Sequence, residues 1–124
     1  MRETIKPFDA TPEYYTPERC HSLELSNTAA DPDVSIARAR VTPGVTTRWH
    51  RLADTTERYV VLEGRGRVEI GELPPAVVGP GDFIVIPPGC RQRIANVGTG
   101  DLVFLAICTP RFQTDAYEDL DDGS

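Results

Sequence analysis

Hydrophobic and polar residues alternate over short stretches along most of the chain, and Gly and Pro residues separate these stretches. In residues 35–41, for example, Ala39 and Val41 alternate with Arg38 and Arg40. A period of two is typical of a β-strand whose two faces meet different surroundings. Helical periodicity is almost absent. The pattern therefore predicts an all-β protein.

The turn residues divide the chain into about nine short strands, roughly 8–12 residues apart, a spacing typical of a sandwich or barrel. The predicted strands are residues 21–25, 35–41, 46–52, 59–62, 67–70, 76–78, 83–86, 91–96 and 102–108. The last of them is apolar throughout, so the pattern does not define which of its faces points inward. One short helical turn is expected near residues 16–20 or in the C-terminal tail.

Length and charge narrow the class of protein. A chain of 124 residues is one domain. The net charge of −6 argues against a nucleic-acid binder, which needs a basic face. No apolar run is long enough to cross a membrane, and the first residues lack the apolar core of a secretory signal. The three cysteines are widely spread and have no C-x-x-C spacing, so we expect reduced thiols in a cytoplasmic protein.

Three regions are expected along the chain. Residues 1–34 read as an irregular N-terminal arm with a short strand, residues 35–110 as the barrel core, and residues 111–124 as an acidic tail. The acidic residues of this tail include Glu118, Asp119, Asp121 and Asp122. A cluster of like charges at a chain end is typical of a solvated, frayed segment.

Two segments of the core resemble the paired motifs of the cupin superfamily. The first motif is carried by Gly44, His50, Leu52, Glu57 and Gly64. The second is carried by Gly81, Pro87, Gly89, Gln92 and Asn96. Cupins have a second histidine where this chain has Leu52, and another histidine where it has Gln92, so two of the four usual metal-ligand positions are altered. The resemblance covers about residues 35–110.

The resemblance implies a single-domain cupin-type double-stranded β-helix, which is a jelly-roll barrel, and a homodimer. Residues two apart share one face of a strand, and the resemblance directs this face toward the barrel interior. The side chains expected inside are Arg48, His50, Leu52, Glu57, Tyr59, Val61, Gln92 and Ile94. A mostly apolar pocket with a few convergent polar groups is typical of a small-molecule site. The expected ligand is a small polar or carboxylated metabolite.

Three functions fit these residues. In the first, His50 and Glu57 act as general acid and base with Tyr59 as an acid partner, in isomerase-, epimerase- or lyase-like chemistry. The residues expected to bind the ligand are then Arg48, Leu52, Gln92 and Ile94. In the second, the same barrel binds a ligand without turnover.

The third function depends on a metal. His50, Glu57 and Gln92 could hold one divalent ion, with water completing its coordination shell. A non-heme iron dioxygenase uses two histidines and one carboxylate, and this interior supplies only one of those histidines. A metal site is therefore expected to be weak or absent.

Overall fold

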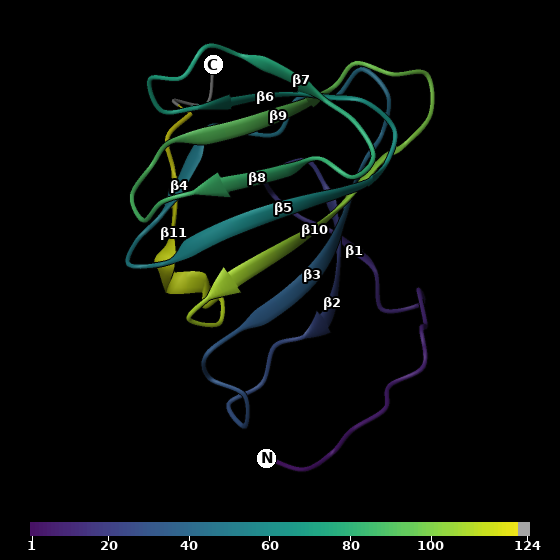
Figure 1. The fold of residues 1–124 in the computed structure, drawn as a ribbon, viewed down its shortest axis with the longest axis vertical. Helices are drawn as coiled ribbons and strands as arrows, with labels where there is room; N and C mark the ends of the chain where they lie inside the picture. The colour runs from purple at the N-terminus through teal and green to yellow at the C-terminus, as the bar shows by residue number, and fades with distance from the viewer. Residues whose placement is uncertain (122–124) are drawn as a thin grey trace.

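Two antiparallel β-sheets form the fold in the computed structural model, which describes residues 1–121 (Figure 1). The larger sheet has the strand order β1 (Tyr14–Tyr15), β2 (His21–Ser26), β3 (Ser35–Val41), β10 (Leu102–Thr109), β5 (Thr56–Glu63) and β8 (Phe83–Ile86). The smaller sheet has the order β11 (Tyr117–Asp119), β4 (His50–Leu52), β9 (Gln92–Asn96), β6 (Gly66–Ile70) and β7 (Ala76–Val78). A single turn of 3-10 helix spans Thr114–Ala116.

The pairing of the strands is nested. β3 pairs with β10, β4 with β9, β5 with β8 and β6 with β7, so strands from the start of the core lie beside strands from its end. This nesting is the double-stranded β-helix, and it confirms the predicted all-β jelly roll. No helix within residues 1–121 is long and apolar enough to cross a lipid bilayer.

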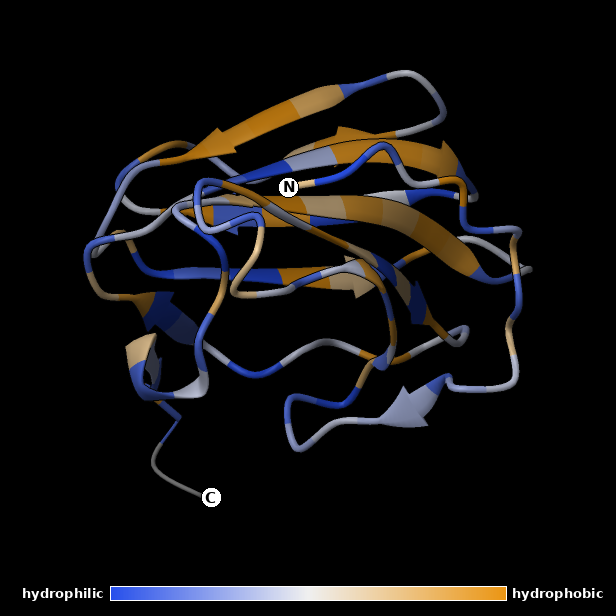
Figure 2. Ribbon diagram, turned by 90° about the horizontal axis from the view of Figure 1, so that it is seen from below, coloured by the Kyte–Doolittle hydropathy of each residue, from blue (hydrophilic) through white to orange (hydrophobic). Residues whose placement is uncertain are grey.

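The hydrophobic core lies between the two sheets. The larger sheet contributes Val41 and Phe104, and the smaller sheet contributes Val68 and Ile94, all of them buried. Figure 2 shows the hydrophobic colour concentrated along the strands, with mostly hydrophilic loops between them. Burial of these side chains is the main force holding the sheets together.

Gly64 sets the turn between β5 and β6. Its φ is +85°, and a Cβ at this position would collide with the backbone oxygen of Asp101 at the start of β10. Only glycine combines this left-handed conformation with so close an approach of another backbone. The turn therefore brings the chain entering β6 of the smaller sheet close to the start of β10 in the larger sheet.

The predicted strand over residues 46–52 is too long, because only His50–Leu52 is a strand. Thr47 donates its backbone N–H to the Ile94 carbonyl and accepts the Ile94 N–H on its side-chain oxygen. The backbone N–H of Arg48 donates to the carbonyl of Glu18 in the arm. Side-chain and arm contacts thus replace the regular ladder before His50.

The prediction of a frayed tail is wrong for the residues just before Asp122, which itself lies outside the described residues. Tyr117–Asp119 pairs with the whole of β4. Arg51 binds Glu118 through two hydrogen bonds of 2.8 and 2.9 Å, and Arg48 binds Asp119 at 2.9 Å. Glu118 and Asp119 therefore have arginine partners on β4 and just before it, and this pairing orders the segment.

Candidate functional site

A cavity of about 340 Å³ opens inside the barrel. The inner face of the larger sheet forms one side, including Tyr59, Phe104 and Cys108. The arm contributes Glu18 and Cys20, and β4 and β11 contribute His50 and Tyr117. The cavity therefore depends on the arm and the C-terminal strand as well as on the core.

His50 is almost fully buried, and its ring orientation is fixed from three sides. Its Nδ1 donates to the carbonyl of Arg48 over 2.8 Å, which leaves Nε2 as the free nitrogen. Nε2 lies 3.6 Å from a carboxylate oxygen of Glu18. The ring stacks on Tyr117, with 5.2 Å between centroids and 22° between planes.

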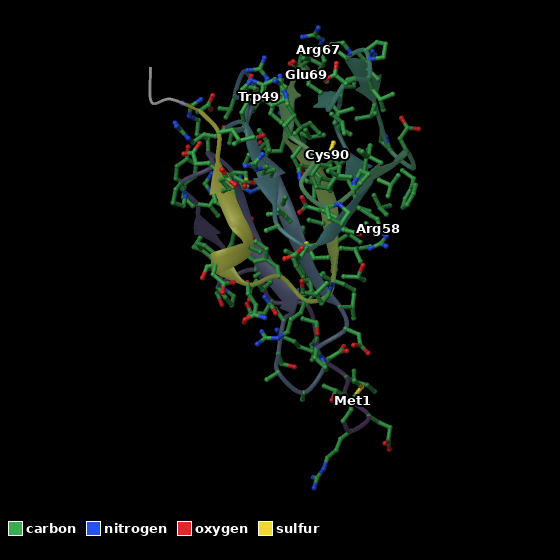
Figure 3. All side chains as sticks on the ribbon, turned by 90° about the vertical axis from the view of Figure 1, so that its left-hand side faces the viewer. Met1, Trp49, Arg58, Arg67, Glu69 and Cys90 are labelled. Carbon is green, nitrogen blue, oxygen red and sulfur yellow. The ribbon has the colours of Figure 1, made fainter. Side chains whose placement is uncertain are left out.

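The neighbouring Trp49 anchors the same segment from outside the barrel. The guanidinium groups of Arg91 and Arg93 lie 4.1 and 4.3 Å from the centre of its ring. Figure 3 places Trp49 at the end of the molecule that carries Arg67 and Glu69, opposite Met1. With Trp49 held outside, the alternation of the strand directs His50 inward.

Glu57, Gln92 and Tyr59 form a buried hydrogen-bonded chain. The Tyr59 hydroxyl donates to the amide oxygen of Gln92 over 2.6 Å, and the Gln92 amide nitrogen donates to Glu57 over 2.9 Å. The second Glu57 oxygen accepts the Cys108 thiol at 3.7 Å. Such a chain satisfies groups that are costly to bury alone, and it fixes the direction in which Glu57 faces.

Burial and charge set the protonation of this chain. Burial, and next the negative charge of Glu18, raise the pKa of Glu57 to about 7, although the nearby His50 and the Gln92 amide act in the opposite direction. Burial, and then the negative charges of Glu57 and Glu18, raise the pKa of Tyr59 well above its usual value of 10.0. At neutral pH Glu57 therefore exchanges its proton readily, and Tyr59 retains its own.

Tyr117 has a buried hydroxyl with no hydrogen-bond partner in the described part of the chain. Burial, and then the charge of Glu18, raise the pKa of this hydroxyl, so it stays protonated. An unpaired buried hydroxyl is costly, and Tyr117 is one of the residues that line the cavity. This makes Tyr117 a candidate contact for a ligand.

The sequence-predicted residues divide into three groups. His50, Leu52, Glu57 and Tyr59 line the cavity. Gln92 lies behind this wall, where it joins Glu57 to Tyr59. The remaining predicted residues are Arg48, which pairs with Asp119, and Val61 and Ile94, which pack in the hydrophobic core.

Sequence reasoning missed Glu18, Cys20, Cys108 and Tyr117 as wall residues. Glu18 and Cys20 lie in an arm with no motif, and Tyr117 lies in the segment predicted to fray. The alternation in residues 102–108 offered two possible inner faces, and the structure selects the one that carries Phe104 and Cys108. Tyr117, which is half-buried, directly precedes the acidic cluster, and its aromatic ring was a signal that the tail contacts the barrel.

The donors near His50 do not fit a transition metal. Leu52 fills the second-histidine position with hydrocarbon, and both ends of the Gln92 amide are already hydrogen-bonded. Within residues 1–121, no group of three or more His, Cys, Asp or Glu side chains is arranged to hold a metal ion.

Solved structures with similar folds include a double-stranded β-helix protein from Klebsiella pneumoniae, with a TM-score of 0.77 and 14% identity over 96% of this chain and all of the other. The nucleoside dehydratase Pac13 matches with a TM-score of 0.75 and 16% identity, covering 94% of this chain and 92% of Pac13. At these identities the comparisons show a shared fold.

Sequence comparison gives the family. The uncharacterized protein MJ1618 of Methanocaldococcus jannaschii is 33% identical over 87 residues, which cover 70% of this chain and 69% of that protein. The family model for the cupin domain matches residues 37–108, which is more than half of the chain. With the nested strand pairing and both glycine-framed motifs in place, the chain belongs to the cupin family.

Proposed function

We propose that this protein binds a small polar organic molecule in the barrel cavity and moves a proton on it, as an isomerase-, epimerase- or lyase-like enzyme. The observation that carries the proposal is the pair formed by His50 and Glu57. Both side chains line one cavity, and one has a free ring nitrogen while the other has a pKa of about 7. Groups that titrate near the working pH are effective in proton transfer.

The environment suggests a role for each residue. Nε2 of His50 removes a proton from the ligand, and Glu18 stabilises the imidazolium that forms. Glu57 in its protonated form gives a proton to a carbon or to a departing hydroxyl, and so completes an isomerisation or a loss of water. Tyr59 and Gln92 are positioning residues, because the Tyr59 proton is committed to Gln92. The likeness to Pac13 supports a lyase-like reaction on this fold.

A second candidate is a binding protein without turnover. The observation that favours it is that Glu57 and Tyr59 are already hydrogen-bonded to Gln92. In this case the polar wall serves only to recognise the ligand, and Nε2 of His50 and the Tyr117 hydroxyl are its free contacts.

A proton-exchange assay separates the two candidates. A panel of small hydroxy and oxo compounds is incubated with the protein in D₂O, and proton NMR follows deuterium incorporation or water loss. We expect wild-type turnover, and a fall of about 10²–10⁴-fold for His50→Asn and for Glu57→Gln. His21→Asn is the matched control, since His21 lies on β2 and pairs with Glu13. Binding without exchange on any compound would favour the second candidate.

We also propose that the reaction needs no metal and that the protein works in the cytoplasm as a homodimer. The donor set around His50 supports the first point, and the three free thiols suit a reducing compartment. Metal analysis of the purified protein, before and after loading with iron, manganese, nickel or zinc, tests the first point. One tightly held equivalent, with activity that chelation abolishes, would contradict it.

A further inference from the structure

We infer that the cavity selects a positively charged ligand, namely a protonated amine carried on an apolar or aromatic body. This inference rests on the proposed binding function of the cavity. It narrows the ligand class expected from the sequence, which was a small polar or carboxylated metabolite.

The charged side chains on the cavity wall are mostly acidic. Glu18, Glu24 and Glu57 line the cavity, and none of its wall residues is an arginine or lysine. In residues 1–121, no arginine or lysine nitrogen lies within 4.0 Å of these three carboxylates. The one basic group on the wall is His50, whose Nδ1 is already hydrogen-bonded to a carbonyl.

Three arginines near the barrel bind carboxylates that lie outside the cavity. Arg48 and Arg51 bind the C-terminal strand, and Arg40 binds Glu13 and Asp101 on the outer face of the larger sheet. Arg48 was the cation that the sequence placed inside the barrel. Without it, no arginine or lysine among the described wall residues can pair with a carboxylate or phosphate on a ligand.

Aromatic rings complete the wall. The five rings that line the cavity belong to Tyr14, Tyr59, Phe104, Phe112 and Tyr117. Ring faces attract ammonium groups, and more strongly where water is excluded. Carboxylates and aromatic faces together favour an organic cation, whereas an anion would be placed beside Glu18 and the partly ionised Glu57. A neutral ligand gains from the rings but not from the charges.

The test compares three ligands of nearly one shape and different charge. The probes are 2-phenylethylamine, 2-phenylethanol and phenylacetate, with tryptamine, tryptophol and indole-3-acetate as a second set. Calorimetry and ligand-observed NMR measure binding at pH 7.5. In at least one set we expect the amine to bind about tenfold or more tightly than the alcohol, with the carboxylate weakest. Added salt should weaken the amine most.

Variants locate the source of the preference. Glu18→Gln should bring the amine down to the affinity of the alcohol. The matched control is Glu72→Gln, which removes the same charge from an exposed loop and should change nothing. Glu24→Gln, at another point on the wall, provides a second variant if Glu18→Gln does not fold.

The inference is overturned if the alcohol or carboxylate binds as tightly as the amine in both sets, if no amine binds at millimolar concentration, or if Glu72→Gln weakens the amine as much as Glu18→Gln does. Its failure differs from failure of the proposed function. Turnover of a neutral or anionic compound would uphold the catalysis and overturn the charge preference. Amine-selective binding without proton exchange would uphold the charge preference and contradict the catalysis.

Discussion

The carboxylate of Glu18 lies 3.6 Å from Nε2 of His50, although Glu18 belongs to the N-terminal arm and His50 to a strand of the smaller sheet. A backbone hydrogen bond also joins the two segments, because the Arg48 N–H donates to the Glu18 carbonyl. The arm therefore adds a negative charge to a buried site that the cupin motifs alone would not supply. That charge contributes to the raised pKa values of Cys20, Glu57, Tyr59 and Tyr117 on the cavity wall.

Glu18→Gln should lower the pKa of Glu57 below its value of about 7, because the charge of Glu18 is the second largest cause of the raised pKa after burial. Carbon-13 NMR of the side-chain carboxyl measures this directly. If Glu57 is the proton donor, the alkaline limb of the pH–rate profile should move to lower pH in the same variant. An unchanged Glu57 pKa would contradict the electrostatic role of Glu18.

Glu57 should make the folded protein less stable as the pH rises. Its pKa rises from 4.5 in the unfolded chain to about 7 in the folded protein, so the folded state retains a proton that the unfolded state loses. The stabilisation is complete below about pH 4.5 and is lost as pH rises through 7. Its size is on the order of 3 kcal/mol.

Urea unfolding of the wild type and of Glu57→Gln tests this effect. The substituted amide does not titrate, and it can still accept the hydrogen bond from Gln92. The stability of the wild type relative to the variant should therefore fall between pH 5 and pH 8. Asp9, Glu13 and Asp119 have lowered pKa values and act in the opposite direction, but both proteins share them. A constant difference across this range would show that Glu57 is ionised throughout.

Tyr117→Phe should stabilise the ligand-free protein, because it removes a buried hydroxyl that has no hydrogen-bond partner within residues 1–121. We expect a gain of about 1 kcal/mol in the free energy of unfolding, together with weaker binding of any ligand that uses this hydroxyl. The control is Tyr15→Phe, whose ring is exposed and lies outside the cavity wall. Loss of stability in Tyr117→Phe would mean that the hydroxyl has a partner in solution.

The sequence alone was sufficient for the fold because the signals that define it are local. The alternation in residues 35–41 gave the bounds of β3 unchanged, and the glycine-framed motifs gave the family. Residues 46–49 failed as a strand because Thr47 bonds to Ile94 through its side chain, and tertiary contacts of this kind leave no trace in the alternation.

Most of the cavity wall could not be predicted, for a related reason. His50, Leu52, Glu57 and Tyr59 follow from the alternation of two strands together with the cupin resemblance, which directs this face inward. Glu18 reaches the wall through the path of an irregular arm, and Tyr117 through a strand held by arginine–carboxylate pairs. Such pairs form between residues that are far apart in the sequence. An acidic run therefore looks the same in the sequence whether it is solvated or paired with arginines.

The outer face of the larger sheet leads to the last prediction, which concerns the proposed homodimer. Phe83, Val60 and Leu105 lie side by side across β8, β5 and β10, and Phe83 and Val85 are 63% and 51% exposed. An apolar sheet face of this kind gains free energy when a second copy covers it. Phe83→Glu combined with Val85→Glu should therefore convert a dimer to a monomer, as measured by sedimentation, while the circular dichroism spectrum stays unchanged. Leu73→Glu is the control, because Leu73 is equally exposed but lies in the loop between β6 and β7. A wild-type protein that sediments as a monomer at micromolar concentration, or a double variant that stays dimeric, would contradict this assignment of the interface.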